Sequence, residues 1–443
     1  MARFGGETQL VVEKTWGSFG ISNDGKQIAF VRNLAEQTKQ ILIIKNLESG
    51  EERELATTDF PELFLYTSAP AWSPDKRKIA FVVENFAARR TSLFLIDALD
   101  GQKEEIKTPQ FWQFEQIAWS PDGESLLVSA SEKGKIFHLW KIFYPDSDAQ
   151  RITNGLNTYG KISVSADGKK FLALQTAESS NIFVADANNL NYQKQITFGN
   201  NNNVGQMALR WAGEDKLVYV SHSEENPMAN LWKTNLADNS RQPLTANTDF
   251  NCDSPTVSAD GKFVYFTTNQ SQFVNAWRMD LSGGNLTQIT DGKDGWRMFP
   301  QISPDGNFLY YIFRNREGGA IKRLNLTNGA EETLLEKGAA NPVAALSLAA
   351  DGSRLSFLNW SNKVGEDDDK TSFQFGIVST ADPTEIKFFD IKNLSVAQLT
   401  ADGKAFDYVS NGEGKTMIMR QSIEGGEPQE IFTLPKARIF NFA

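Results

Sequence analysis

Few side chains in this 443-residue sequence are of the types that perform acid–base, nucleophilic or metal chemistry. The chain has two histidines, His138 in the phrase IFHLW and His222 after YVS, and one cysteine, Cys252 in FNCDSP. Two histidines provide little material for a zinc site or for general-base catalysis, and a single cysteine cannot form an internal disulfide. We therefore expect packed or exposed histidines and a small, buried Cys252.

The acidic residues recur in a pattern that indicates turns. Nine acids are spaced 45 to 51 residues apart, at Asp24, Asp75, Asp122, Asp167, Glu214, Asp260, Asp305, Asp351 and Asp402. Acids that each lie in their own hairpin do not converge on one cation, as the ligands of a calcium site must. A second acidic group, Glu366 to Asp369, lacks the spacing of an EF-hand and is expected to be a solvated loop. We predict no metal, no cofactor and no catalytic residue.

Aromatic residues and one arginine are the candidates for binding a partner. They gather in the connections between successive repeats, and include Phe60, Phe64, Tyr66, Phe111, Trp112, Phe114, Tyr159, Phe250, Trp296, Arg297, Met298 and Phe299. Aromatic side chains and Arg are the types that anchor interfaces. The candidate partner-binding face comprises Phe64, Tyr66, Trp112, Phe114, Tyr159, Trp296, Arg297 and Phe299. It requires Trp112, Trp296 and Arg297 to be exposed, and the alternative is that these side chains pack inside the fold.

These residues are positioned by a repeat of about 47 residues. Its nine copies contain ISNDGKQIAF, WSPDKRKIAF, WSPDGESLLV, VSADGKKFLA, WAGEDKLVYV, VSADGKFVYF, ISPDGNFLYY, LAADGSRLSF and LTADGKAFDY. Each copy indicates four short strands, which in the sixth copy are the strand leading to TVS, then KFVYFTT, NAWRMDL and LTQIT.

The phrase S-x-D-G predicts a tight hairpin turn between the first two strands of each copy. Asp accepts local backbone N–H bonds, and Gly supplies the positive φ that ends the turn. Two copies depart from the phrase, because Asp75-Lys76-Arg77 lacks the glycine and Glu214-Asp215 replaces Asp-Gly. We expect both to remain hairpins of altered geometry.

Four-stranded units of this length, repeated many times, predict an all-β fold, the β-propeller. Each sheet has two apolar faces that it cannot bury alone. Layers between neighbouring blades are expected to contain residues such as Ile79, Phe81, Leu93, Leu95, Phe263 and Tyr265. We expect nine four-stranded antiparallel sheets, with all the S-x-D-G turns on one face. A parallel β-helix is the alternative, but its coils are shorter and lack this hairpin chemistry.

The phrases at Trp72, Trp119 and Ile302 resemble the TolB-type, WD-repeat-like propeller repeat, and the resemblance covers essentially the whole chain. Pieces such as NAWRMDLSGGNLTQITDG also resemble the C-terminal propeller region of bacterial serine/threonine kinases and winged-helix regulators. A weaker similarity connects the chain to the N-terminal propellers of prolyl oligopeptidase and dipeptidyl peptidase IV.

The resemblance implies a fold without implying catalysis. The sequence has no H-R-D, D-F-G or G-x-S-x-G motif, so no family catalytic residue has a counterpart here. We expect a non-catalytic module that binds a protein or small-molecule ligand as the sensor or interaction domain of a larger bacterial signalling or regulatory protein. The alternative is a substrate-gating propeller of a serine peptidase whose catalytic domain is absent from this sequence.

The repeats run over residues 1–443, and the number of blades per ring stays open. The tract Asn200 to Asn203 is either a joint between two propellers near residue 200 or a long loop between blades. Glu7 to Val12 matches a fourth strand and Arg438 to Ala443 a first strand, so we expect both ends to lie within blades and further domains to be attached.

Charge and hydropathy limit the classes of partner. The net charge is −10 and the pI is about 5.0, which argues against a chain-wide phosphate-binding surface, so we expect no nucleic acid to be bound. No run of about eighteen apolar residues occurs, so we expect no membrane insertion. Similar propellers are found in extracytoplasmic and cytoplasmic proteins, and the sequence does not assign a compartment.

Overall fold

The hairpin turn predicted from S-x-D-G forms in a computed structural model of the chain. In the sixth repeat, Asp260 Oδ1 accepts hydrogen bonds from Ser258 Oγ (2.7 Å) and from the backbone N–H of Lys262 (3.1 Å). The N–H of Phe263 donates to Ser258 Oγ (3.0 Å), and Gly261 has a φ of 66°. The positive φ explains why glycine ends this turn, since other residues are strained there. The predicted turn type is therefore confirmed.

The structure describes residues 10–13, 15, 17–34, 39–59, 61–85, 90–132, 136–155, 157–177, 179–186, 189–198, 204–205, 208–222, 228–245, 250–271, 273–315, 318–338, 343–361, 372–391, 394, 396–412, 414–435 and 439. Within these ranges the regular elements are all strands. No helix among them is long and apolar enough to cross a membrane.

The strands occupy four positions in each repeat. The first position holds β1 (Gly20–Ile21), β5 (Glu62–Phe64) with β6 (Ala71–Trp72), β10 (Gln113–Trp119), β14 (Thr158–Val164), β18 (Leu209–Trp211), β22 (Cys252–Val257), β26 (Trp296–Ile302), β30 (Val343–Leu348) and β34 (Ala397–Leu399). The second position holds β2 (Gln27–Leu34), β7 (Lys78–Asn85), β11 (Ser125–Ser131), β15 (Phe171–Thr176), β19 (Lys216–Ser221), β23 (Phe263–Ser271), β27 (Phe308–Arg314), β31 (Arg354–Ser361) and β35 (Ala405–Gly412).

The two outer positions complete the repeat. The third position holds β3 (Lys39–Asn46), β8 (Arg90–Asp97), β12 (His138–Phe143), β16 (Phe183–Asp186), β20 (Asn230–Asn235), β24 (Phe273–Asp280), β28 (Gly318–Asn325), β32 (Ser372–Ser379) and β36 (Lys415–Ser422). The fourth position holds β4 (Glu52–Asp59), β9 (Lys103–Ile106), β13 (Ala149–Arg151), β17 (Asn189–Gln195), β21 (Arg241–Pro243), β25 (Thr287–Gln288), β29 (Glu331–Gly338), β33 (Ile386–Asp390) and β37 (Gln429–Pro435).

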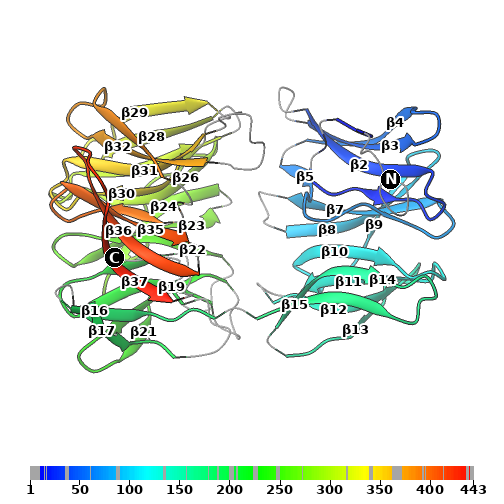
Figure 1. Cartoon of the computed structure of the whole chain (residues 1–443), viewed down its shortest axis with the longest axis horizontal. Coiled ribbons are helices and arrows are strands. Elements are labelled where there is room, and N and C mark those ends of the chain that lie inside the picture. Colours follow the sequence, from blue (N-terminus) through cyan, green and yellow to red (C-terminus); the bar gives the residue numbers. More distant parts are fainter. Residues whose placement is uncertain are drawn as a thin grey trace. The chain divides into compact units, whose positions relative to one another are not determined.

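Eight of the nine repeats form one antiparallel sheet each, with the strands in sequence order (Figure 1). In the second repeat the first position is divided between β5 and β6, both of which pair with β7. The fourth repeat differs from the expectation, because β14 pairs with β15 and β16 pairs with β17 in two separate two-stranded sheets. The second strand of this repeat, β15, and its third strand, β16, therefore belong to different sheets.

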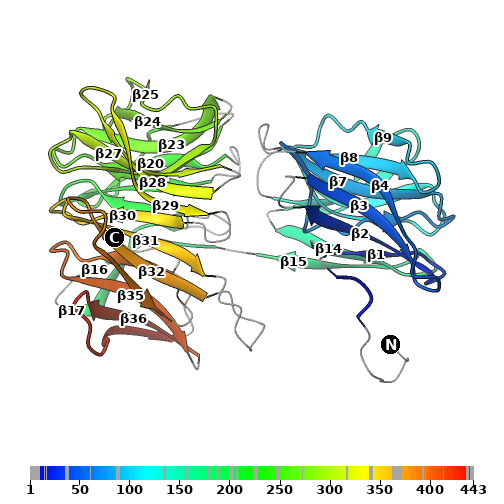
Figure 2. The ribbon, with the colours of Figure 1, turned by 90° about the horizontal axis from the view of Figure 1, so that it is seen from above.

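The chain forms two compact units, Met1–Glu178 and Ser179–Ala443. The first unit contains three whole repeats and the β14–β15 hairpin, and the second contains the β16–β17 hairpin and five whole repeats. Figure 2 shows the sheets of each unit from above. The tract 200–203, expected to be a joint or a long loop, lies outside the described residues, as do most of the two chain ends.

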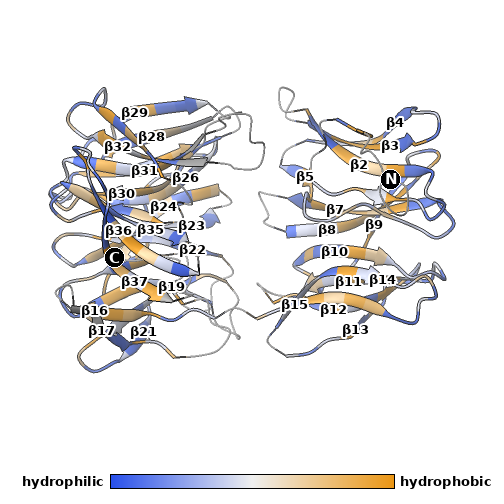
Figure 3. Ribbon diagram, in the orientation of Figure 1, coloured by the Kyte–Doolittle hydropathy of each residue, from blue (hydrophilic) through white to orange (hydrophobic). Residues whose placement is uncertain are grey.

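The core lies between neighbouring blades, as the strand patterns predict. On β7, Ile79 and Phe81 pack toward the first blade, while Ala80 and Val82 pack toward the third. Leu93 and Leu95 join the second of these layers, and Tyr265 with Phe263 lies in the layer between the sixth and seventh blades. Figure 3 shows apolar residues along the middle of strands such as β10 and β12. The alternating residues of each inner strand therefore bury both of its faces.

The S-x-D-G turns stack on one another within each unit. A Cβ added to Gly123 or Gly168 would lie 3.8 Å or 3.3 Å from the proline ring of the preceding turn, Pro74 or Pro121. In the second unit Gly352 lies closest, since its Cβ would be 2.8 Å from Cδ of Pro304. These contacts place consecutive turns on the same face of their unit.

The two unusual turns also remain hairpins. Lys76 takes the place of the glycine with a φ of 62°, and its ammonium binds Asp24 of the first repeat (2.7 Å). In the shortened turn the positive φ, 89°, belongs to Gly213, one residue before Glu214. Both pairs of flanking strands, β6–β7 and β18–β19, are formed.

Two matched substitutions separate backbone strain from turn stacking. Gly306 and Gly352 have φ values of 74° and 75°, but only Gly352 has a neighbour within 4 Å of an added Cβ. We expect Gly306→Ala to lower the free energy of unfolding by about 1 kcal/mol. Gly352→Ala should lower it by roughly 1–3 kcal/mol more, because the methyl group meets Pro304. Urea unfolding measures both, and equal losses would show that the stacking contact is unimportant.

Candidate functional site

The aromatic residues of the first unit lie on the connections that enter the first strands. Phe64 ends β5, Tyr66 follows it, Trp112 precedes β10, and Phe114 and Tyr159 lie on β10 and β14. Tyr66 is exposed, with 57% of its surface accessible, while Trp112 and Tyr159 are half-buried. We call Tyr66, Trp112 and Tyr159 the aromatic rim.

Hydrogen bonds hold the aromatic rim at one end of the sheets. The N–H of Trp112 donates to Ser131 O (2.7 Å), and Ser129 Oγ donates to Tyr159 O (2.5 Å), so both connections are bonded to the end of β11. The side chain of Gln116 donates to Thr67 O, beside Tyr66. The three rim residues are therefore supported by a rigid sheet and by side chains that the sequence did not single out.

Phe64 and Phe114 are not surface residues. Phe64 packs edge-to-face on Phe81 (5.4 Å between centroids), and Phe114 packs in the same way on Phe111 (5.3 Å). Both are buried in the layers between blades, because the connection carries its aromatic residues across to the next sheet. The expectation that they belong to an exposed face is wrong.

In the second unit, Arg297 is 8% exposed, whereas a partner-binding face that includes it requires an exposed guanidinium. Trp296 is half-buried, and the half-buried Phe299 packs on the layer between the seventh and eighth blades. A β-bulge between Met298 and Gln301 interrupts the pairing of β26 with β27, and Phe299 has a φ of 54°. A bulge redirects side chains by inserting an extra residue. Bulges with one residue of positive φ recur in β14, β22 and β30, at Lys161, Ser254 and Ala345.

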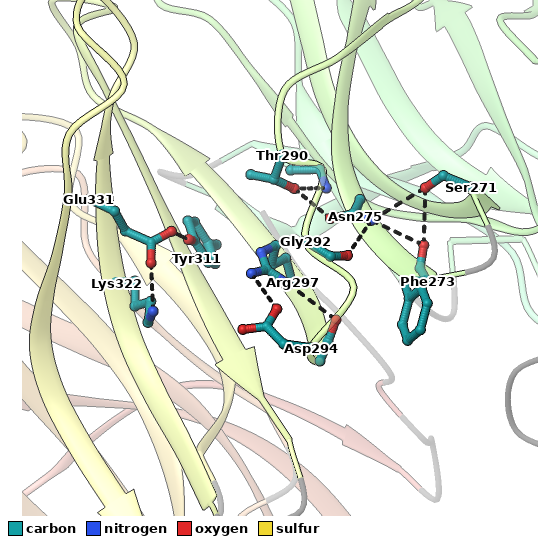
Figure 4. Close-up of polar contacts among 12 residues, drawn as sticks. Ser271, Phe273, Asn275, Thr290, Gly292, Asp294, Arg297, Tyr311, Lys322 and Glu331 are labelled. Atoms are coloured by element: carbon teal, nitrogen blue, oxygen red, sulfur yellow. Dashed lines mark hydrogen bonds and ion pairs between the residues drawn. The ribbon is translucent and has the colours of Figure 1, made fainter. Parts of the chain in front are cut away.

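Arg297 belongs to a polar seam formed by the seventh blade and the connection that enters it (Figure 4). Its Nη2 donates to Asp294 Oδ1 (2.8 Å) and its Nη1 to Gly295 O (3.3 Å). The guanidinium lies 5.1 Å from the ring centroid of Phe313, and Lys322 Nζ lies 4.7 Å from the same centroid. Two cations thus contact one aromatic ring.

Two further charged contacts complete the seam on the seventh blade. Lys322 Nζ donates to Glu331 Oε1 (2.5 Å), and the buried Tyr311 hydroxyl donates to Glu331 Oε2. Burial, with the adjacent Glu331 carboxylate, raises the pKa of Tyr311. Burial opposes ionisation of Glu331, but the hydrogen bonds from Lys322 and Tyr311 hold the pKa of Glu331 below its ordinary value. These donors and acceptors are used within the seam, which therefore fixes the entering connection against the seventh blade.

A threonine after the fourth strand supports the connections that leave the third to sixth repeats, and sequence reasoning missed it. Thr290 Oγ1 accepts the N–H of Ala276 (2.9 Å) and donates to Asn275 Oδ1 (3.0 Å), while Asn275 Nδ2 donates to Gly292 O (3.2 Å). The same two bonds join Thr245 to Leu231 and Asn230 in the fifth repeat. The available signal was an Asn near the start of the third strand, at Asn181, Asn230 and Asn275, which lies 15 or 16 residues before the Thr.

The turn aspartates, Cys252 and His222 are the remaining candidates for chemistry, and they lie in different repeats or turns. Hydrogen bonds from Ser258 and from the Lys262 N–H lower the pKa of Asp260, and Asp167, Asp305 and Asp402 accept hydrogen bonds within their own turns in the same way. Cys252 is fully buried, and burial raises the pKa of its thiol to about 12. His222 is also buried. Such a thiol is not a nucleophile at neutral pH.

His138 occupies the position that Asn230 and Asn275 take in their repeats. It is buried, and its Nδ1 has no hydrogen-bond partner among the described residues. Thr153 Oγ1 still accepts the N–H of Leu139 beside it (2.9 Å), as in the other repeats. His138 is thus a packed residue of the layer between blades.

No group of three or more His, Cys, Asp or Glu side chains in the described part of the chain is arranged to hold a metal ion. Glu366 to Asp369 lie outside the described residues, so the structure gives no geometry for this acidic group.

Comparisons with known proteins agree with this geometry. Residues 9–213 match the family model described as PD40, TolB beta propeller domain. This match covers less than half of the chain, and it shows that the region is similar to TolB-type propeller repeats. A curated relative of the chain, dipeptidyl-peptidase 5 of Porphyromonas gingivalis, is 24% identical over 174 residues, which are 37% of this chain and 25% of the relative. The chain thus aligns with about a quarter of that protein's length.

Solved propeller structures are less similar to this chain in sequence. TolB from Acinetobacter baumannii is 14% identical, with a TM-score of 0.33 over 83% of this chain and 64% of that chain. A prolyl endopeptidase is 13% identical, with a TM-score of 0.31 over 93% of this chain and 55% of that chain. Similarities at this level carry no information about function.

The polar seam predicts a steric requirement at Gly292. A Cβ added there would lie 1.8 Å from Cζ of Arg297, so Gly292→Ala must displace the guanidinium. We expect the free energy of unfolding to fall by roughly 1–3 kcal/mol. Gly338→Ala is the matched control, since nothing lies within 4 Å of its added Cβ. In an Arg297→Ala background the cost of Gly292→Ala should vanish, and a cost that persists in denaturant unfolding would contradict the packing argument.

Acidification should destabilise the chain through His138. Burial, together with the charge of Arg151, lowers the pKa of His138 from 6.5 to about 4. In the unfolded chain the imidazole gains its proton near its ordinary pKa of 6.5, while in the folded chain it stays neutral down to about pH 4. The folded state therefore keeps its full stability above pH 6.5 and loses stability as the pH falls toward 4. We expect His138→Asn to remove this loss, which is about 3 kcal/mol at pH 4. Urea unfolding of both proteins at pH 7 and pH 4 checks it, and equal losses would refute the assignment.

Proposed function

We propose that this chain is a non-catalytic recognition domain, which binds a protein or small-molecule ligand through the aromatic rim. The TolB-type repeats supply a rigid frame, and the rim residues lie where the connections enter the first strands of three successive blades. Connections carried on a rigid scaffold are the usual location of binding residues. The domain would act as the sensor or interaction part of a larger bacterial protein.

The exposed Tyr66 beside the half-buried Trp112 and Tyr159 is the observation that supports this function most directly. Tyr and Trp supply a large contact area at low entropic cost, and they are common among the residues that dominate binding energy. The acids of the turns and the charges of the seam are engaged in local bonds. Recognition therefore fits the chemistry of the rim better than proton or group transfer does.

A second candidate function is substrate gating for a serine peptidase. The similarity to the dipeptidyl peptidase of Porphyromonas gingivalis favours it. The coding sequence of the parent protein distinguishes the two roles. A G-x-S-x-G hydrolase domain downstream would support gating, whereas a kinase or winged-helix domain upstream would support recognition in signalling.

The rim can be tested with one exposed and one half-buried substitution. We expect Tyr66→Ala to change the free energy of unfolding by less than about 0.5 kcal/mol. Tyr66→Ala and Trp112→Ala should each weaken the binding of a partner captured by the native chain by at least tenfold or so. Leu99→Ala is the control, because Leu99 is an exposed apolar residue of a turn outside the rim. Equal partner affinity in all four proteins, measured by calorimetry, would exclude the rim as the binding surface.

A further inference from the structure

Glu115 is an acidic group beside the aromatic rim that belongs neither to a turn nor to the polar seam. It lies on β10, three residues after Trp112, where a bulge between Phe114 and Gln116 interrupts the pairing with β11. Its side chain is half-buried, and it forms no ion pair with a cation in the described part of the chain. A carboxylate that is partly removed from water without such a partner is costly, so its presence needs a reason.

The carboxylate of Glu115 reaches the first strand of the next blade. A Cβ added to Gly160 of β14 would lie 3.0 Å from Glu115 Oε2 and 3.3 Å from Oε1, so the glycine leaves room for the carboxylate. Gly160 directly follows Tyr159 of the rim. The hydroxyl of Ser129, which donates to Tyr159 O, lies beside the same carboxylate. Glu115 is therefore held next to the backbone of one rim residue.

The two other rim residues are connected to the same place. Gln116, the residue after the glutamate, donates to Thr67 O, and Thr67 directly follows Tyr66. The N–H of Trp112 donates to Ser131 O (2.7 Å) on β11, the strand that also carries the serine hydroxyl beside the carboxylate. All these residues belong to the first unit. One carboxylate and the aromatic rim are thus gathered within a single unit.

Two described cations near the rim leave the carboxylate available to a ligand. The charge of Lys161 favours ionisation of Glu115, but the Lys161 side chain is exposed and forms no ion pair with any described residue. Arg90 donates to Pro109 O (3.1 Å) and Phe111 O (2.9 Å), so its guanidinium is engaged by the connection. Burial raises the pKa of Glu115, and the opposing effect of Lys161 is smaller. A cation bound at the carboxylate would offset this effect of burial.

We propose that Glu115 binds the guanidinium of an arginine side chain, which a protein ligand of the aromatic rim presents. This inference rests on the proposed function of the rim and specifies its ligand. A carboxylate accepts two parallel N–H bonds from a guanidinium, and the planar cation stacks on the faces of Tyr and Trp side chains. An ammonium offers neither the paired donors nor the flat surface, so the combination favours Arg over Lys. The net charge of −10 also attracts basic ligands.

Short peptides that differ at one residue test the class of ligand. We expect acetyl-Gly-Arg-Gly-amide to bind the full chain with a dissociation constant on the order of 1 mM, measured by ligand-observed NMR. The peptide with citrulline in place of Arg has the same shape without the charge and should bind about tenfold more weakly or less. The lysine peptide should bind roughly threefold more weakly. Equal binding of the Arg peptide and either other peptide, or no binding of the Arg peptide at about 10 mM, would overturn the proposal.

Variants of the full chain test the residue. Glu115→Gln keeps the size of the side chain and removes its charge, and it should weaken binding of the Arg peptide by about tenfold while leaving the citrulline peptide unaffected. Gly160→Ala keeps the charge but displaces the carboxylate, so it should weaken the Arg peptide severalfold. Glu105→Gln is the control, because Glu105 is exposed on β9 outside the rim. Urea unfolding checks that each variant is folded, and native affinity in both Glu115→Gln and Gly160→Ala would refute the assignment.

Tyr66→Ala separates this proposal from the function of the rim. We expect it to weaken the Arg peptide as well, because the guanidinium loses an aromatic face. If Tyr66→Ala weakens the peptide and Glu115→Gln does not, the rim remains the binding surface and the role of Glu115 is overturned. If neither variant changes the affinity, the proposed function of the rim fails together with this inference.

Discussion

Burial of both faces of each four-stranded sheet is the constraint on which the structure depends. A strand such as β7 sends alternate residues to opposite sides, and each side becomes apolar core only when a neighbouring blade covers it. No blade is therefore stable by itself, and the core is a series of layers between blades. The short turns, their stacking and the crossing connections all serve to bring the next sheet within contact.

This constraint explains why aromatic residues of the connections divide between core and surface. The connection leaves the outer strand of one blade and enters the innermost strand of the next, so its apolar side chains pass over the layer between them. Phe64 and Phe114 fall into that layer, whereas Tyr66 comes after β5 has ended and stays exposed. At Arg297 the same geometry buries a charge, which is tolerated because Asp294, Gly295 and Phe313 contact the guanidinium.

The local features could be predicted from the sequence, and those set by neighbouring blades could not. The turn at Gly261 depends on six residues, so its geometry follows from the phrase SADGKF. The alternation of Ile79 and Phe81 with Ala80 and Val82 likewise follows from strand period. The burial of Arg297 depends on Gly292, because the absence of a Cβ there leaves room for the guanidinium. Both residues lie in or beside a connection between blades, and no residue pattern specifies the path of that connection. The bulge at Phe299 has no sequence signature either, since Lys161, Ser254 and Ala345 occupy the same position.

In the fourth repeat, the burial of a strand depends more on the neighbouring strands and sheets than on its own sequence. Its turn is formed like the others, with Ser165 Oγ donating to Asp167 Oδ1 (2.6 Å) and Gly168 at a φ of 69°. Its strands carry the apolar residues of an inner blade, yet β15 is exposed where β11 is buried. In the described part of the chain, the sheet of β15 contains β14 and β15, whereas β11 pairs with both β10 and β12. In a repeat array of this kind, a turn therefore forms from its own phrase, whereas the burial of a strand depends on the strands and sheets beside it.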